Sequence, residues 1–227
     1  MRTFTFVMAL LVCILFITPR VVAEESSIVF SKAKEETKKI ALTFDDGPHP
    51  RYTERILKIL EKHNVKATFF VIGINVKNYP EALKKVHAAG HEIANHTYYH
   101  NNEKRLDVSS IEREISECEK IVLDTVGVKP RLFRPPQGDY NEATKRVALD
   151  NGYSIILWSV DTRDWDGNSA QGIASTVIRE VSGGDIILMH DYVSCQNTTC
   201  DALEILIPRL KSLGYEFVSV GELIGLK

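Results

Sequence analysis

Residues 40–48 read IALTFDDGP, in which an apolar, β-rich run ends at two adjacent aspartates, Asp45 and Asp46, followed by Gly47-Pro48. The run predicts a buried strand, and the Gly-Pro pair predicts the turn that ends it. Two carboxylates ~4 Å apart repel each other by about 4 kcal/mol at an effective dielectric constant of ~20. A neutral residue would suit the fold better, so the pair indicates a function, although Asp-Asp-Gly alone is also an ordinary turn signal.

Strand and helix patterns alternate from this stretch to the C-terminus. The predicted strands cover residues 39–44, 66–73, 91–96, 131–136, 153–161, 185–191 and 215–220, and the predicted helices cover 52–64, 79–90, 109–127, 141–152, 170–184 and 201–214. Thr53 and either Ser109 or Ser110 are the expected N-caps of two helices. This alternation predicts a parallel α/β sheet, and no glycine-rich phosphate loop follows the first strand. We therefore expect a barrel-like closure of seven β/α units, with the chemistry at the C-terminal ends of the strands.

The first 23 residues have the pattern of a secretory signal peptide. Arg2 precedes 17 uncharged residues, and small residues lead to a cleavage site after Ala23. Arg20 lies between the apolar run and that site, so an uncleaved membrane anchor is the alternative, at the short limit for a span. We expect a polar lead-in over 24–37, one catalytic domain over 38–227, and a secreted or cell-surface protein that contacts the membrane only if the anchor stays.

Composition and charge restrict the partners. The 227 residues are 44% apolar and 26% charged, which is typical of a globular domain, and the net charge of −2 becomes −4 when the two arginines of residues 1–23 are removed. This balance argues against a nucleic-acid partner, and we expect a monomer. Cys195 and Cys200 bracket a short polar loop, which favours a disulfide in an oxidising compartment over two free thiols. Cys118 is expected to pack as a small hydrophobe.

Side chains capable of chemistry follow five of the predicted strands. They are Asp45 and Asp46, then His96 and His100, then Arg134, then Asp161, Asp164 and Trp165, and last His190 and Asp191. Each group alone has a structural explanation, such as a rigid turn, a solvated histidine pair or a packed tryptophan. Because parallel strands end on one face of a barrel, the five groups together predict a single active site.

The histidine pair and the aspartate pair predict a catalytic metal centre. Two histidines and one carboxylate can hold a divalent ion with coordination positions left open. Successive side chains of a strand point to opposite sides, so we expect Asp45 and Asp46 to have different roles, one facing the metal and the other the substrate. A bound ion would lower the pKa of its water from 15.7 toward ~7, and the second aspartate could accept the proton.

Five motifs in this order, TFDDGP, HTYYH, RPPQG, DTRDW and LMHD, resemble those of the polysaccharide deacetylases, carbohydrate esterase family 4, also called NodB-homology domains. The resemblance implies a distorted seven-unit (β/α) barrel. It also implies removal of acetyl groups from sugar polymers with a divalent ion, most often Zn²⁺, with Co²⁺, Mn²⁺ and Ni²⁺ as alternatives.

The same resemblance implies a role for each motif residue. Asp45 would be the general base and His190 the general acid, with Arg134 orienting Asp45 and Asp164 orienting His190. Asp46, His96 and His100 would hold the metal. Trp165 and Leu188 would line a pocket for the acetyl methyl group, and the backbone N–H of Gln137 would stabilise the oxyanion.

Two positions bear on the substrate. Many family members have an aromatic residue where this chain has Gln137, so sugar contacts of that side chain are open, and Tyr140 is expected either to offer an aromatic face or to pack. Family members that act on N-acetylmuramic acid often lack the second aspartate, and Asp46 is present here. The expected reaction is N-deacetylation of N-acetylglucosamine in peptidoglycan or a chitin-type polymer.

Other functions remain open on the residues alone. An O-acetyl esterase acting on xylan would use the same site. A glycosidase would need Asp45 and a second acid such as Asp164, and it would leave both histidines without a role. An iron oxygenase would use the histidine–carboxylate triad, and a non-catalytic sugar-binding module would not need an acid and a base.

Overall fold

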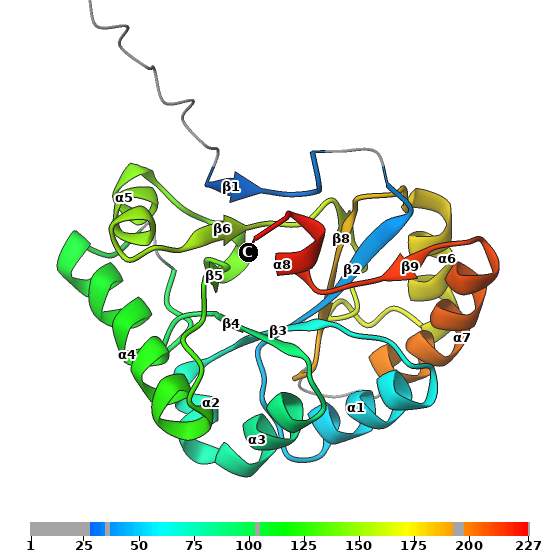
Figure 1. Cartoon of the computed structure of the whole chain (residues 1–227), viewed down its shortest axis with the longest axis horizontal. Helices are drawn as coiled ribbons and strands as arrows, with labels where there is room; N and C mark the ends of the chain where they lie inside the picture. Colours follow the sequence, from blue (N-terminus) through cyan, green and yellow to red (C-terminus); the bar gives the residue numbers. More distant parts are fainter. Residues whose placement is uncertain (1–27, 35–36, 103–104, 193–197, 227) are drawn as a thin grey trace, which may run out of the picture.

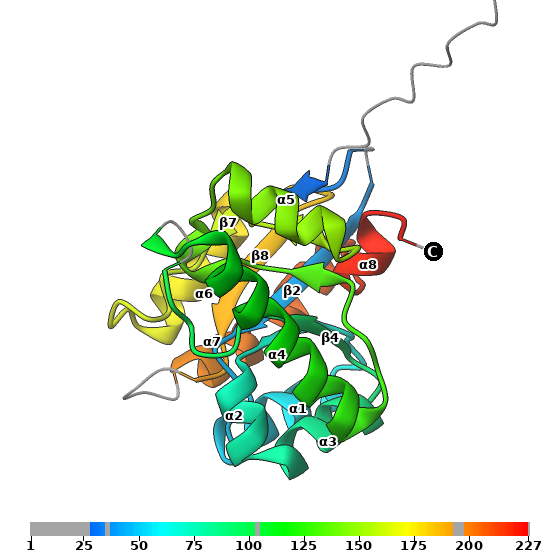
Figure 2. The same ribbon diagram turned by 90° about the vertical axis from the view of Figure 1, so that its left-hand side faces the viewer.

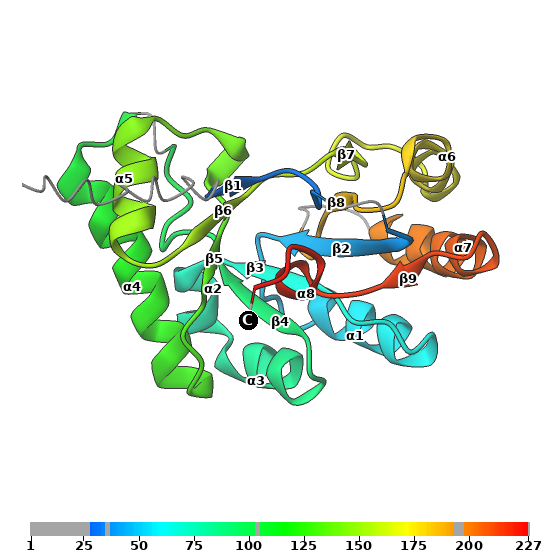
Figure 3. The same ribbon diagram turned by 45° about the horizontal axis from the view of Figure 1, so that its top comes forward.

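The computed structural model describes residues 28–34, 37–102, 105–192 and 198–226. Parallel strands curl into an open barrel that is surrounded by helices (Figure 1). The strand order is β1-β6-β5-β4-β3-β2-β8-β7, and β9 pairs with β2 beside this path. The predicted α/β barrel is therefore confirmed, with β2 between β3 and β8 in its wall (Figure 3).

The bounds of the elements agree broadly with the sequence patterns. The strands are β1 Val29–Phe30, β2 Lys39–Asp45, β3 Thr68–Val71, β4 Glu92–Asn95, β5 Leu132–Phe133, β6 Ser154–Ile156, β7 Val160–Asp161, β8 Ile186–His190 and β9 Glu216–Phe217. The helices are α1 Tyr52–Lys62, α2 Gly73–Asn78, α3 Pro80–Ala88, α4 Val108–Val126, α5 Glu142–Asp150, α6 Ala170–Glu180, α7 Thr198–Ser212 and α8 Val220–Leu223.

Strand β2 is apolar because both of its faces are covered. Only its first residue, Lys39, is partly exposed, and the rest of the strand is buried. It lies between β3 and β8, so that Thr43 pairs with Thr68 on one side and with Leu188 on the other. A parallel strand enclosed in this way reads as a continuous apolar run rather than an alternating one, which accounts for the IALTF pattern.

The core has one layer outside the barrel and one inside it. Outside, Phe44 and Phe69 stack with ring centroids 5.1 Å apart beneath the helices. Inside, Phe70 and Ile156 belong to a second cluster of buried side chains. A third cluster, which includes Ile115 of α4, joins α4 and α5 to β5 and β6, and Figure 2 shows these two helices over that side of the sheet.

The predicted strand 153–161 is in fact two strands. β6 pairs with β1 and β5, whereas β7 pairs with β8. The chain changes neighbours at Leu157–Ser159, so a single straight strand cannot form, and the barrel opens there. The prediction failed because an apolar run does not reveal which strands lie beside it.

Smaller differences lie at chain ends and helix starts. The polar lead-in contains β1, and α2 was not predicted. Asp107, rather than Ser109 or Ser110, caps α4 by accepting a hydrogen bond from the N–H of Ser110 at 2.8 Å. Thr53 is not an N-cap, because α1 begins at Tyr52 and the Thr53 hydroxyl is buried in contacts described below.

The structure tests only part of what was expected for the N-terminus and the cysteines. The predicted signal peptide, residues 1–23, lies outside the described residues. Within the described residues, no helix has the length and apolar character needed to cross a membrane. Cys118 is buried as expected. Cys200 is a free, buried thiol of α7 among the described residues, and its predicted disulfide partner, Cys195, lies outside them, so the pairing stays a prediction.

Candidate active site

The C-terminal ends of the strands surround a cavity of about 510 Å³. Its lining contains most of the residues that the motifs singled out, and the lining residues come from the ends of β2, β4, β5, β6, β7 and β8 and the loops that follow. The lining residues are Asp45, Asp46, His96, His100, Gln137, Trp158, Asp161, Trp165, Leu188 and His190. The predicted convergence of strand ends on one site is thus present in the structure.

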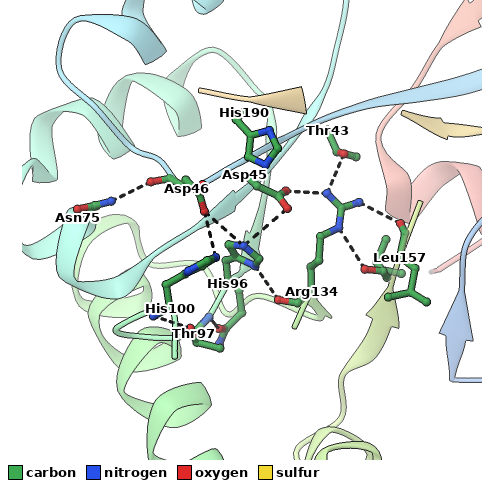
Figure 4. Close-up of polar contacts among 12 residues, drawn as sticks. Thr43, Asp45, Asp46, Asn75, His96, Thr97, His100, Arg134, Leu157 and His190 are labelled. Atoms are coloured by element: carbon green, nitrogen blue, oxygen red, sulfur yellow. Dashed lines mark hydrogen bonds and ion pairs between the residues drawn. The ribbon is translucent and has the colours of Figure 1, made fainter. Parts of the chain in front are cut away.

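Asp45 is held by a buried arginine. Arg134 Nη1 donates to Asp45 Oδ1 at 2.6 Å, and both side chains are almost completely buried (Figure 4). The other guanidinium N–H groups donate to Thr43 Oγ1 and to the carbonyls of Ile156 and Leu157, at 2.9–3.1 Å. The guanidinium also lies 4.0 Å from the centroid of the Phe70 ring. This network fixes the Asp45 carboxylate and balances its charge.

Asp46, His96 and His100 form a group that fits a metal ion. One ligand atom from each lies within 4.8 Å of the other two. Asp46 Oδ1 is 3.5 Å from His96 Nε2 and 3.4 Å from His100 Nε2. That oxygen is buried and makes no hydrogen bond, so a cation would satisfy it. A carboxylate oxygen between two imidazole nitrogens is a ligand set that zinc and several other divalent ions accept.

The hydrogen bonds and neighbouring charges of the two histidines bear on metal binding. His96 Nδ1 lies 2.7 Å from the carbonyl of Arg134, which can only accept, so Nδ1 carries the proton and Nε2 is left as the ligand atom. Burial and the neighbouring His96 lower the pKa of His100, which favours the neutral form that binds metals. Burial opposes a charge on His96, but Asp45 and Asp46 outweigh it and raise its pKa, so these carboxylates attract a cation to this place.

The two aspartates lie closer together than strand alternation predicted. β2 ends at Asp45, and Asp46 has a φ of 74°, in the left-handed region that ordinary residues seldom adopt. His96 Nε2 lies 3.7 Å from Asp45 Oδ2 as well as 3.5 Å from Asp46 Oδ1. Both carboxylates therefore border one cavity, and the expectation that they face opposite sides was wrong. Although burial raises the pKa of Asp46, the histidines around it lower it overall.

His190 is tied to Asp164 by two hydrogen bonds. Its Nδ1 lies 2.7 Å from Asp164 Oδ1, and its backbone N–H donates to Asp164 Oδ2 at 2.9 Å. Thr199 Oγ1 donates to the same Oδ2 at 2.7 Å. Burial disfavours the imidazolium, but the Asp164 carboxylate outweighs burial and raises the pKa of His190 to about 9. The ring is therefore protonated at neutral pH, with Nε2 as the nitrogen free to give up a proton.

The residues expected at the substrate divide into two groups. Gln137, Trp165 and Leu188 line the cavity, and the Trp165 side chain is 51% exposed. Tyr140 does not line this cavity, and its ring lies 5.5 Å from Lys145 Nζ. Of the two alternatives for Tyr140, the structure places its ring beside Lys145 on the flank of α5 rather than at the site.

Sequence reasoning missed the lining residue Trp158, whereas Asp161 was marked at a strand end but was given no role. Asp161 ends β7 and accepts the N–H of Arg163 at 2.9 Å, so its position at a strand end was the signal that marked it. Trp158 had no such signal, because it lies inside an apolar run that read as a strand interior. The ring also lies near Gly138, where an added Cβ would come within 2.8 Å of it.

The sequence of the chain matches a known protein family. A family model described as polysaccharide deacetylase matches residues 32–156, more than half of the chain. The chain belongs to the polysaccharide deacetylase family. This confirms the resemblance drawn from the five motifs, and the protein is therefore a hydrolase of the carbohydrate esterase family 4 type.

Bacterial deacetylases are similar to this chain over most of its length. It is 38% identical over 206 residues to a peptidoglycan-N-acetylglucosamine deacetylase of Bacillus cereus, covering 90% of this chain and 96% of that protein. It is 41% identical over 196 residues to the corresponding enzyme of Listeria monocytogenes, covering 86% of this chain but only 41% of that longer protein. The crystal structure of the Bc1960 peptidoglycan N-acetylglucosamine deacetylase superposes with a TM-score of 0.86 at 35% identity, covering 89% of this chain and 95% of that one.

Proposed function

We propose that this deacetylase removes N-acetyl groups from N-acetylglucosamine units of peptidoglycan, or of a chitin-type polymer, outside the cell. The single observation that carries the proposal is that Asp45, the Asp46–His96–His100 group and His190 all border one open cavity. The similarity to the two bacterial peptidoglycan-N-acetylglucosamine deacetylases supports peptidoglycan as the first polymer to test.

The metal requirement rests on Asp46, His96 and His100, which would hold a divalent ion, with Zn²⁺ as the first candidate. When bound, such an ion polarises a carbonyl and lowers the pKa of a coordinated water. The protein's share is to present one carboxylate and two imidazole nitrogens at a place where neighbouring carboxylates favour a cation.

The proton transfers are assigned to Asp45 and His190. Asp45, fixed by Arg134, accepts a proton from the water that attacks the acetyl carbon. The carbon–nitrogen bond then breaks, and His190 donates a proton to the departing amine, which is a poor leaving group when unprotonated. Acetate and a free amino sugar are the products. Asp45 and His190 are paired residues on the adjacent strands β2 and β8, so base and acid both reach the reacting amide.

The remaining residues of the cavity would recognise the acetyl group. Trp165 and Leu188 offer apolar surface for its methyl. Gln137 has a φ of 61°, a strained turn conformation in the three-residue helical turn Pro136–Gly138, and its backbone N–H is proposed to face the oxyanion. A preorganised N–H is a property of the backbone, so glutamine in place of an aromatic residue leaves this role intact.

Acetate release and chain length together test the proposal. The purified protein with Zn²⁺ is incubated with peptidoglycan, chitooligosaccharides and acetylated xylan, and acetate, free amines and product lengths are measured. The proposal expects acetate and free amines in equal amounts from a substrate that contains N-acetylglucosamine, with unchanged chain length. Acetate from xylan alone would indicate an O-acetyl esterase, and shortened chains would indicate a glycosidase.

A further inference from the structure

Four aromatic rings gather beside the catalytic strand ends, and neither the family motifs nor the proposed mechanism uses them. His49 lies at their centre. Its ring stacks on Tyr192 with centroids 4.8 Å apart and planes 9° apart, and it lies 4.6 Å from Tyr52 and 5.7 Å from Tyr79. We call these four residues the aromatic platform.

The chain connects the aromatic platform directly to the catalytic residues. His49 follows Asp46 by three residues, and Tyr192 follows His190 by two. Across the two strand ends, the N–H of Asp191 donates to the carbonyl of Asp45 at 3.1 Å. The platform therefore lies on the same end of the barrel as the cavity, beyond β2 and β8.

Tyr79 joins the platform from the junction between α2 and α3. The N–H of Tyr79 donates to the carbonyl of Asn75 at 2.8 Å, and Asn75 Nδ2 donates to the carbonyl of Asp46 at 2.8 Å. The third tyrosine is thus tied to the backbone of the metal-binding aspartate. Hydrogen bonds through Asn75 connect the aromatic platform to the candidate metal site.

Hydrogen bonds fix the centre of the platform. The His49 N–H donates to Thr53 Oγ1 at 2.8 Å, and Thr53 Oγ1 in turn donates to the carboxylate of Asp191. His49 Nδ1 accepts the N–H groups of Arg51 and Tyr52 at 3.2 and 3.3 Å. This places its proton on Nε2, and burial together with Arg51 lowers the pKa of His49, so the ring is neutral and oriented. Because the platform is already ordered, ligand binding costs little conformational entropy there.

The tyrosines are too exposed for a role in the core alone. Tyr79 is 37% exposed and Tyr192 is 43% exposed. Their packing against neighbouring side chains therefore leaves much of each ring accessible to a ligand. Flat rings with polar edges suit a sugar, because the C–H groups of a pyranose form an apolar face while its hydroxyl groups point outward. Tyrosine hydroxyls and His49 Nε2 can bond those hydroxyls.

We propose that the aromatic platform is a binding subsite for a further sugar ring of the polymer whose acetyl group is removed in the cavity, with the outer face of Tyr192 as the stacking surface. The proposal rests on the proposed function, since the occupant is the same acetylated sugar chain. Continuity between the loops that carry Asp46 and His190 and those that carry His49 and Tyr192 is what selects this occupant. The proposed subsite would make residues outside the catalytic motifs responsible for the preference for long substrates.

The test compares long and short substrates. Acetate release is measured on N-acetylglucosamine pentamer and dimer for the wild type, Tyr192→Ala, Tyr192→Phe and, as a remote control, Leu149→Ala, an exposed residue of α5. We expect Tyr192→Ala to lower kcat/KM on the pentamer about tenfold, through KM, and on the dimer less than about twofold. Leu149→Ala should remain within about twofold on both lengths, and Tyr192→Phe, which keeps the stacking ring, should lose less activity on the pentamer than Tyr192→Ala. Equal loss on both lengths, or no loss on the pentamer, would overturn the subsite.

Calorimetric titration separates this inference from the proposed function. Pentamer is titrated into Asp45→Asn and into Asp45→Asn/Tyr192→Ala, which removes turnover from the readout. An about tenfold weaker Kd in the double variant supports the subsite, and an unchanged Kd overturns it. If the wild type releases no acetate from any sugar, the proposed function fails, and the titration still decides whether the platform binds the chain. Stronger binding of an apolar peptide than of the pentamer would also contradict the sugar subsite.

Discussion

Asp45 and His190 are register partners on the adjacent parallel strands β2 and β8. The proposed base and acid therefore come from neighbouring backbones, and each has its own charged partner, Arg134 for Asp45 and Asp164 for His190. Two separate ion pairs allow a carboxylate and an imidazolium to coexist near one cavity without neutralising each other. The pairing thereby keeps an acceptor and a donor of protons available in the same state of the enzyme.

Asp45→Asn tests the base. The amide keeps the shape of the side chain but cannot accept the proton, so kcat should fall by ~10²–10⁴ or more. Zinc content, measured by atomic absorption, should be unchanged because Asp45 is outside the proposed ligand group. Wild-type turnover in this variant would remove Asp45 from the mechanism.

His96→Ala tests the metal site. Loss of one of two imidazoles should reduce Zn²⁺ retention in equilibrium dialysis by at least ~10-fold, with loss of activity. His87→Ala, an exposed histidine of α3, is the matched control and should keep both zinc and activity. Equal zinc affinity of His96→Ala and the wild type would show that the ligands lie elsewhere.

Asp164→Asn tests the acid. Asp164 raises the pKa of His190 to about 9, so His190 is protonated and active below that pH, and activity should fall as pH rises through about 9. Without the carboxylate the pKa falls, and the alkaline limb of the kcat profile should move toward about 6.5. A profile whose alkaline limb does not move would separate Asp164 from the acid.

Arg134→Met tests the buried ion pair. Removing the guanidinium leaves Asp45 charged and buried, which should lower the free energy of unfolding by about 3–5 kcal/mol, measured by urea denaturation. Arg134→Met/Asp45→Asn should recover part of this loss, because the orphaned charge is gone, but should recover no activity. If the double variant were less stable than Arg134→Met, the stability loss would come from packing around Phe70 instead.

The sequence predicted the site well where chemistry and strand ends coincide. Asp45, His96, Arg134 and His190 each follow an apolar run, and parallel strands bring such ends together. Alternation failed for Asp46, because β2 ends one residue earlier and the positive φ of Asp46 turns its side chain back toward His96. A local rule cannot predict where a strand stops.

Contacts between segments that are far apart in the sequence could not be predicted either. Trp158 lines the cavity only because the chain leaves β6 for β7 at that point, which depends on which strands are its neighbours. The aromatic platform brings together residues from three separate segments of the chain, namely His49 and Tyr52, Tyr79, and Tyr192. No local sequence pattern marks any of these four residues as part of a site. Such groups become visible only when the fold is known.

Acetate release from N-acetylglucosamine oligomers, before and after metal removal, tests the central claim most directly. The enzyme is treated with a chelator, dialysed, and assayed with and without added Zn²⁺, with Asp46→Ala as the variant that lacks one ligand. The account predicts that acetate release stops in the metal-free enzyme, returns with Zn²⁺, and stays absent in Asp46→Ala at the same zinc concentration. Undiminished acetate release from fully metal-free enzyme would contradict it.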